Sequence, residues 1–412
     1  MISSQPSLLY IDMAHTVETV RRTKHEAFFD ARHGEGYFHK VWGVHPLADA
    51  GGKQSRQIEA IRFSRRQIAV EGVSQMFPLP KFLLPLNFLL SQVALLRVLR
   101  RLVRKHDISV IGASDAVYAG LLGWCLKKVT GKPLAIRIYS NNDELYEATG
   151  ALAMPRLIPF RWLEKLVVRF VLSHADLVIG ANRSYLDWAL ANGARRQTAI
   201  IPNAKYVERR HFLEPAARPR PAEVFDRLGI QSGRPILLYL GRLLALKLPD
   251  DAIRAMAAVI SRRPDVVGIL VGAGPMKAEL EELIDRLGVK GRVHLVGQLS
   301  QEEVSQVIPH CITLSPLTGL ALIECGLAGS PIVAYDRDWQ GEFVTDGADG
   351  FVVPFRDVDA MAAKALQLIE DPALARSFSE RIRKRALELA DRDRIAALEA
   401  STFNRLLGRD SA

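Results

Sequence analysis

Short apolar runs rich in β-branched residues alternate with longer segments of helical periodicity along the whole chain. This alternation is typical of parallel sheets whose two faces are covered by helices, so the pattern predicts an α/β fold. The strands predicted in the first half are 8–12, 38–44, 58–63, 108–112, 134–139, 177–180 and 199–201. The strands predicted in the second half are 236–240, 266–271, 293–296, 312–315, 331–335 and 350–353.

A proline-rich stretch at residues 208–221 separates the two series of strands. Small and basic residues surround its prolines, which is typical of an exposed linker. The end of the chain shows helical periodicity without strand signals and is expected to pack back on the lobes. The predicted parts are an N-terminal Rossmann-like domain (1–214), a linker (215–221), a C-terminal Rossmann-like domain (222–376) and a helical segment (377–412).

The charge is distributed unequally. Residues 1–220 hold 32 Lys and Arg against 18 Asp and Glu, whereas the remaining residues hold 23 against 27, so the formal charge of +10 arises in the N-terminal half. No helix-turn-helix, zinc-finger spacing or aromatic RNA-binding signature accompanies it, which argues against nucleic acid as a partner. Three cysteines without paired spacing and the lack of a signal-peptide pattern favour a cytoplasmic location.

Basic and aromatic residues interleave at residues 53–105, where 11 Lys and Arg are opposed only by Glu59 and Glu71. Within this range, FLLSQVALLRVLRRLVRK combines apolar residues at helical spacing with a basic cluster at one end. Polar residues interrupt the apolar run, which argues against a membrane span. Such a helix is typical of an interfacial anchor, so we expect peripheral contact with an anionic membrane at its inner face. A core helix with a solvated basic end is the alternative.

The segment GRLLALK directly follows the predicted strand 236–240. Gly241 ends the strand and delivers Arg242 and Lys247 to the loop at its carboxyl end. Arg presents a planar fork to phosphate oxygens and Lys a compact point charge, so the pair is suited to stabilising a departing diphosphate. The alternative is a solvated basic loop.

The turn VGAGP places Gly272 and Gly274 between a strand and a helix. Glycine lets the backbone approach a ligand closely. The full dinucleotide-binding and P-loop patterns are absent, so an ordinary strand-to-helix turn is the alternative.

The segment SPLTGLALIE predicts a helix whose first residues include Thr318, Gly319 and Leu320, directly after the strand 312–315. Exposed amides at a helix N-terminus attract phosphate without a metal ion. Glu324, farther along this helix, is suited to accept hydrogen bonds from ribose hydroxyls. A glutamate that merely opposes the helix dipole is the alternative.

Together with VHLVGQLSQEEV and DGADGFVVPFRD, these motifs resemble the C-terminal domain of the family 4 glycosyltransferases, group 1 type, over roughly residues 235–368. That family has the GT-B fold, in which two Rossmann-like domains face each other across a cleft, and its members retain the anomeric configuration. The resemblance implies that Arg242 and Lys247 hold the donor diphosphate and that Glu324 binds the ribose. It also implies that Gln298 lies in the loop around the base, and that no metal is needed beside the nucleoside diphosphate sugar.

Two parts of the chain depart from the family pattern. A second glutamate usually stands eight positions before the ribose ligand, and here Pro316 occupies that position. Many members also place a histidine near the transferred sugar where this chain has Asn141, Asn142 and Asp143. These three residues and His15 are the candidate acceptor-side residues. Capping and turn formation are the alternative roles for the Asn and Asp residues.

We therefore expect an enzyme that moves a hexose from a nucleoside diphosphate sugar to a glycan or lipid-linked acceptor in cell-surface polysaccharide biosynthesis. Retention is implied by the resemblance alone. Two alternatives stay open. One is a nucleotide-sugar epimerase of the same fold, which needs an acid–base pair that is not evident in the sequence. The other is a non-catalytic, donor-binding subunit of a glycan assembly complex, suggested by Pro316 and the basic N-terminal half.

Overall fold

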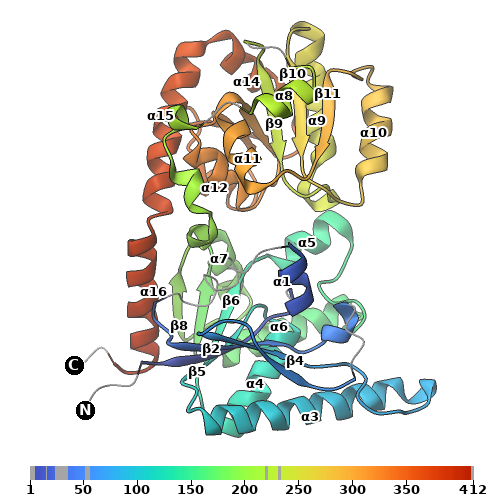
Figure 1. Ribbon diagram of the computed structural model, residues 1–412, viewed down its shortest axis with the longest axis vertical. Helices are drawn as coiled ribbons and strands as arrows, with labels where there is room; N and C mark the ends of the chain where they lie inside the picture. Colours follow the sequence, from blue (N-terminus) through green and yellow to red (C-terminus); the bar gives the residue numbers. More distant parts are fainter. Residues whose placement is uncertain are drawn as a thin grey trace. The chain divides into compact units, whose positions relative to one another are not determined.

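The computed structural model describes residues 5–14, 16–23, 36–51, 56–218, 221–230 and 233–409 of the chain. It divides into two compact units. Unit 1 comprises Met1–Tyr206 and Arg392–Ala412, and unit 2 comprises Val207–Asp391. Each unit has a largely parallel sheet with helices on it (Figure 1), so the α/β prediction is confirmed.

The described residues of unit 1 form an eight-stranded sheet in the order β3-β4-β2-β1-β5-β6-β7-β8. All neighbours are parallel except β3 and β4. The sequence patterns missed β4. The strands are β1 Ser7–Ile11, β2 Lys40–His45, β3 Glu59–Arg62, β4 Gln67–Glu71, β5 Val110–Ala113, β6 Leu134–Ile138, β7 Leu177–Gly180 and β8 Gln197–Ile200.

Helix α4 packs against both α3 and α6, and these three helices bury Leu95, Leu126 and Val171 in one core with the strands. Gly131, in the left-handed conformation, ends α4, which is a common way to terminate a helix. The helices of unit 1 are α1 Val17–Thr23, η1 Ala48–Gly51, η2 Lys81–Leu83, α3 Leu84–Lys105, α4 Tyr118–Thr130, α5 Asn142–Thr149, α6 Arg161–His174, α7 Arg183–Ala191, η3 Asn203–Tyr206 and α16 Arg392–Leu406.

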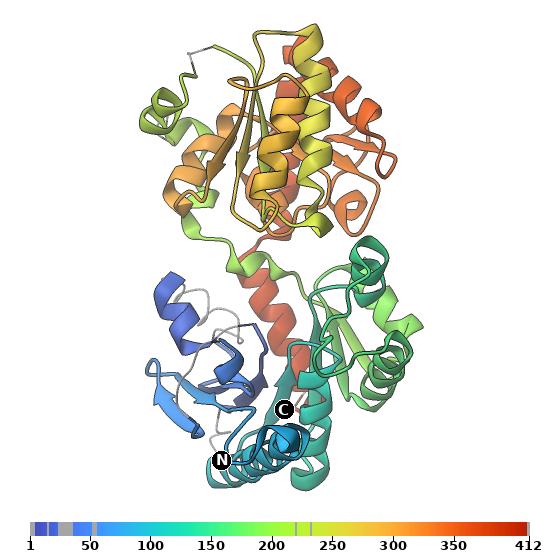
Figure 2. The same ribbon diagram turned by 90° about the vertical axis from the view of Figure 1, so that its right-hand side faces the viewer.

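The C-terminal helix α16 returns to unit 1, where it lies beside the strands (Figure 2). A buried ion pair fixes it: Arg137 Nη1 of β6 lies 3.2 Å from Glu399 Oε1, and both side chains are almost fully buried. Arg137 Nη2 also donates to the carbonyl oxygen of Ile201 at 3.0 Å. Tyr37 OH donates to Asn404 Oδ1 at 2.8 Å. The last helix is therefore part of the core of unit 1.

The described residues of unit 2 form a six-stranded sheet in the order β11-β10-β9-β12-β13-β14, with all neighbours parallel. The strands are β9 Ile236–Leu240, β10 Val267–Val271, β11 Val293–Gly297, β12 Ile312–Ser315, β13 Ile332–Tyr335 and β14 Phe351–Val353. The helices are η4 Arg209–Phe212, η5 Pro215–Ala217, α8 Ala222–Arg227, η6 Ala245–Lys247, α9 Pro249–Arg262, α10 Lys277–Arg286, α11 Gln301–Val307, η7 Ile308–His310, α12 Ala321–Leu327, α13 Gln340–Phe343, α14 Val358–Glu370 and α15 Pro372–Leu389.

Local signals explain several of these boundaries. Pro249 occupies the first position of α9, where its missing N–H costs nothing, and the preceding Leu248 has a positive φ of 50°. Ser300 and Glu303 form the capping box of α11, with each side chain bonded to the backbone of the other residue. The predicted segment 377–412 comprises most of α15, in unit 2, and α16, in unit 1.

The segment that the sequence predicts as an exposed linker is docked on unit 2 up to Arg218. This guanidinium is 6% exposed and donates to the carbonyl oxygens of His211, Leu213, Ser305 and Leu327. A charge held by four carbonyl dipoles explains how arginine is tolerated there. The chain changes unit at Tyr206, eight residues before the predicted domain end.

Candidate functional site

The loops that carry the predicted donor motifs follow adjacent strands of unit 2. From β9 the chain continues through β10 to β11 on one side of the sheet, whereas β12, on the other side of β9, leads to β13 and β14. The carboxyl ends of β9 and β12 therefore flank the point where the strand order reverses. Open parallel sheets bind ligands in the crevice at such a point.

Backbone hydrogen bonds join these loops. The amide of Gly241 donates to the carbonyl oxygen of Val271 at 3.0 Å, and that of Gly272 donates to Gly297 at 2.9 Å. A Cβ atom added to Gly241 would lie 3.7 Å from the side-chain methyl of Thr318. The structure thus brings the loops after β9, β10, β11 and β12 together. Gln298 is exposed and directly follows the Gly297 carbonyl that accepts from Gly272.

The loop that bears Arg242 and Lys247 is held by a tyrosine beneath it. Tyr239 is fully buried, and its hydroxyl donates to the carbonyl oxygens of Arg242 at 3.0 Å and Lys247 at 3.4 Å. Burial raises the pKa of this phenol, so the hydroxyl keeps its proton. The Arg242 side chain is exposed, and its guanidinium makes no hydrogen bond or ion pair with the described residues. The guanidinium is therefore available to an anion while its backbone is fixed.

Both glycines of VGAGP are required by close packing. A Cβ atom at Gly272 would overlap the carbonyl oxygen of Gly241, and one at Gly274 would overlap that of Leu243. Gly272 also has a φ of 146°, which L side chains rarely adopt. These positions pack two loops against each other. The two glycines therefore have the structural role that the sequence analysis gave as the alternative, and they allow the loops after β9 and β10 to pack closely.

Replacing Gly272 by alanine is expected to separate the two loops and weaken donor binding by about tenfold or more, since a displacement of about 1 Å disrupts a preorganised site. Gly288→Ala is the matched control, because Gly288 also has a positive φ but an added Cβ meets no atom within 4 Å. The control should lower the melting temperature and leave the donor dissociation constant unchanged. Equal donor affinity in Gly272→Ala and wild type would contradict this role.

The third motif differs from its prediction. Helix α12 begins at Ala321, so Thr318 and Gly319 lie in the loop before it. The Thr318 hydroxyl is buried and bonded to Ser315 Oγ, which also contacts Gln340 Oε1 at 2.6 Å. Gln340 Nε2 in turn donates to the carbonyl oxygen of Pro316 at 2.8 Å. The Thr318 hydroxyl therefore helps to hold this loop in place.

The backbone after Thr318 is open. A Cβ atom at Gly319 would meet nothing within 4 Å, and the amides of Gly319 and Leu320 donate to no described residue. Such unpaired amides next to the start of a helix are suited to an anion. The buried side-chain amide of Gln340 fixes this loop. The sequence analysis missed it because Gln340 and Pro316 are 24 positions apart in the chain.

Glu324 lies in α12 and is half-buried. Burial raises the pKa of its carboxyl to about 7, and the negative charge of Glu208 adds to the increase. A pair of hydroxyl donors would stabilise the ionised form of this carboxyl group by hydrogen bonding to it.

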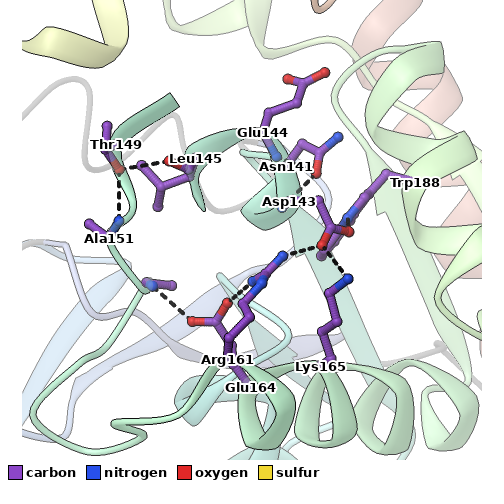
Figure 3. A network of polar contacts seen from close by, with 11 residues as sticks. Asn141, Asp143, Glu144, Leu145, Thr149, Ala151, Arg161, Glu164, Lys165 and Trp188 are labelled. Atoms are coloured by element: carbon purple, nitrogen blue, oxygen red, sulfur yellow. Dashed lines mark hydrogen bonds and ion pairs between the residues drawn. The ribbon is translucent and has the colours of Figure 1, made fainter. Parts of the chain in front are cut away.

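The candidate acceptor-side residues of unit 1 have structural roles (Figure 3). Asn141 caps α5, since its side chain accepts from the amides of Asp143 and Glu144. Asp143 accepts from Trp188 Nε1 at 2.7 Å and pairs with Arg161 and Lys165. The capping alternative is therefore correct for Asn141, and Asp143 is a structural ion-pair partner.

Asn142 is buried at the start of α5, with 9% of its surface exposed. His15 lies outside the described residues. No group of three or more potential metal-ligating His, Cys, Asp or Glu side chains occurs in the described part of the chain.

Two carboxylates that the sequence analysis missed lie where the strand order of unit 1 reverses. Asp12 directly follows β1 and is 3% exposed, and Asp115 follows the adjacent strand β5. Asp115 Oδ1 accepts from the amides of Val117 and Ala119, so it caps the start of α4. Burial raises the pKa of Asp115 to about 6, and Asp12 adds to the increase. The signal available in the sequence was an acidic residue after each of the two strands.

Comparison with known proteins agrees with the motifs. Residues 222–385 match the family model of glycosyl transferases group 1. Alpha-D-kanosaminyltransferase of Streptomyces kanamyceticus is 28% identical over 305 residues, which cover 70% of this chain and 75% of that protein. The GDP-mannose-dependent alpha-(1-6)-phosphatidylinositol monomannoside mannosyltransferase of Mycolicibacterium smegmatis is 25% identical over 74% of this chain and 78% of that protein.

Solved structures extend the likeness to the whole fold. Sucrose-phosphate synthase from Thermosynechococcus elongatus superposes with a TM-score of 0.72 at 18% identity, covering 98% of this chain and 99% of that one. The HepE protein of Anabaena, in complex with UDP and glucose, superposes with a TM-score of 0.70 at 16% identity, covering 97% and 100%. The predicted GT-B fold is therefore confirmed.

Proposed function

Because the chain is an enzyme that transfers sugars, with a group 1 glycosyltransferase domain and the GT-B fold, we propose that it moves a hexose from a nucleoside diphosphate sugar to a glycan or lipid-linked acceptor. The donor binds unit 2, at the crevice between the loops after β9, β10 and β12. The anomeric configuration is retained, as the resemblance to family 4 implies.

The observation that carries this proposal is the loop after β9. A buried phenol fixes its backbone, and the exposed guanidinium of Arg242 lies at its start beside two packed glycine loops. Arg242 and Lys247 then neutralise the departing diphosphate, for which preorganised positive charge lowers the barrier. The open amides of Gly319 and Leu320 donate hydrogen bonds to the same diphosphate. Glu324 binds the ribose hydroxyls and orients the nucleoside.

The acceptor and the location belong to the same proposal. The name of the mannosyltransferase relative of Mycolicibacterium smegmatis includes phosphatidylinositol monomannoside, a lipid. This chain carries its surplus of positive charge in the N-terminal half. We infer a role in cell-surface polysaccharide synthesis on the cytoplasmic side, with peripheral contact with the inner face of the membrane. Of the candidate acceptor-side residues, His15 and Asn142 are kept in this proposal, and we add Asp12 and Asp115, which follow the adjacent strands β1 and β5.

The test is a donor screen with the purified protein. UDP- and GDP-linked hexoses are compared by calorimetry and by release of the nucleoside diphosphate, with and without glycan or lipid-linked acceptors. One donor should bind and be hydrolysed slowly in water. EDTA should leave turnover unchanged, since cationic side chains and amides supply the positive charge. If no nucleotide sugar binds, the assignment of Arg242, Lys247 and Glu324 to a donor fails.

A non-catalytic donor-binding subunit is the second candidate, because Pro316 stands where the family carries an acidic residue. Binding of a donor without hydrolysis or transfer to any acceptor would favour it. In that case Gln340 and Ser315 hold a binding loop that performs no chemistry.

Donor affinity should depend on pH through Glu324. Ribose hydroxyls donate to the ionised carboxylate, so a carboxyl with a pKa of about 7 must lose its proton before the donor binds. The dissociation constant is therefore expected to rise as pH falls below about 7, by up to about tenfold per pH unit. Glu324→Gln, measured by calorimetry across the same range, should show a flatter profile and weaker binding at pH 8. An unchanged slope in this variant would assign the pH dependence to another group.

A further inference from the structure

Helix α3, with the preceding turn η2, presents a row of large apolar side chains to solvent on unit 1. Phe82 is 80% exposed and Leu89 is 59% exposed, and Leu86 and Leu90 are exposed beside them. Figure 1 shows α3 along the outside of unit 1. Scattered apolar residues are normal on a surface, but a contiguous row marks an interaction site.

The exposed side of α3 changes from apolar to cationic along its length. The residues exposed in its second half are Arg97, Arg100, Arg101, Arg104 and Lys105. No Asp or Glu occurs between Glu71 and Asp107. We call this exposed row, from Phe82 to Lys105, the α3 stripe.

The opposite side of α3 belongs to the core of unit 1. Leu95, Leu99 and Val103 are buried in the core, and polar contacts fix the start of the helix. Asn87 Nδ2 donates to the carbonyl oxygen of Phe77 at 2.7 Å, and Gln92 Nε2 to that of Val73 at 3.1 Å.

The segment Lys81–Lys105 is long and apolar enough to cross a bilayer by length and composition. If α3 crossed the bilayer, these contacts would break and the polar groups now buried in unit 1 would lie in lipid without hydrogen-bond partners. The helix is therefore placed to lie on a membrane and not to cross it.

We propose that the α3 stripe docks unit 1 on an anionic phospholipid bilayer. The apolar end, around Phe82, Leu86 and Leu89, enters the boundary between headgroups and acyl chains. The basic end lies over the lipid phosphates, where each Lys or Arg adds to the attraction. This deepens the membrane-peripheral part of the proposed function and rests on it, but it does not depend on the donor site of unit 2.

Charge complementarity selects a membrane over a second copy of the chain. In a two-fold symmetric contact along this helix, the two copies of α3 run either antiparallel or parallel. An antiparallel pair sets the apolar end of one copy on the basic end of the other, and a parallel pair sets basic end against basic end. Both arrangements bury cations without carboxylate partners, which is unfavourable. A bilayer surface offers apolar and anionic layers to one helix at the same time.

The position of the apolar end fits a lipid-linked acceptor. Helix α3 follows β4 and leads into β5, so it begins at the carboxyl edge of the sheet and ends at the amino edge. Asp12 and Asp115 lie at that carboxyl edge. Docking by the apolar end therefore brings the acceptor-side edge toward the lipid.

The experiment is flotation of the full chain with vesicles of phosphatidylcholine alone or mixed with phosphatidylglycerol, at low and high salt. Wild type should bind the anionic vesicles about tenfold or more tightly than neutral ones. Leu86→Ser with Leu89→Ser should lose binding to both kinds. Arg97→Gln with Arg101→Gln should lose only the preference for anionic lipid and its salt dependence.

Leu387→Ser is the matched control, because Leu387 is an exposed leucine on α15 in unit 2. Its vesicle binding should equal that of wild type. Failure of wild type to float, or equal flotation of all variants, would overturn the proposal, as would a wild-type dimer that the leucine variant converts to monomer. Donor binding is measured on the same samples. A protein that floats without binding a donor contradicts the proposed function and leaves the docking surface intact.

Discussion

Replacing both Arg242 and Lys247 by alanine is expected to lower kcat/KM for donor hydrolysis and transfer by about a thousandfold, with each single substitution costing about a hundredfold. The magnitude follows from the loss of preorganised charge at the departing group, where one donor contributes a factor of about 10²–10³. The two losses should add incompletely, because both cations act on the same diphosphate. Steady-state kinetics of the four proteins measures the effect.

The kinetic parameters distinguish transition-state stabilisation from simple binding. Loss of kcat at unchanged KM indicates cations that act on charge formed during the reaction, whereas a raised KM alone indicates uniform binding of the donor. Arg262→Ala is the control, since Arg262 is an exposed arginine at the opposite end of α9. The proposal fails if the double variant keeps more than about a tenth of wild-type kcat/KM.

The architecture of unit 2 was largely readable from the sequence because its signals are local. Each strand is a short apolar run, and the cations and glycines follow these runs directly, so parallel pairing alone brings them to one edge. Strand β4 was missed because QIAVE begins directly after a polar SRR segment. Strand β4 is largely buried because it pairs with two other strands. One is β2, which lies well before it in the sequence, and the other is the antiparallel strand β3.

The acceptor side was less readable because its residues act over long range. Asp143 resembles a ligand residue in the sequence, yet its carboxylate accepts a hydrogen bond from Trp188, which lies 45 positions later.

The start of α12, in unit 2, was misjudged for a similar reason. TGLALIE reads as a helix from Thr318, but the Ser315 hydroxyl and the buried Gln340 hold the preceding residues in a loop. Side-chain networks of this kind compete with helix formation and leave no periodic signal.

Replacing Glu399 by alanine is expected to destabilise unit 1 by about 3–5 kcal/mol, because it leaves the buried charge of Arg137 uncompensated in the core. The melting temperature of the unit should fall by about 10 °C. The double variant Arg137→Met with Glu399→Leu removes both charges and keeps the volume, so it should recover most of the loss. Thermal and urea unfolding of the three proteins provides the comparison, and donor binding to unit 2 should persist throughout. If the double variant is as unstable as Glu399→Ala, packing of α16 and not charge pairing carries the stability of this contact.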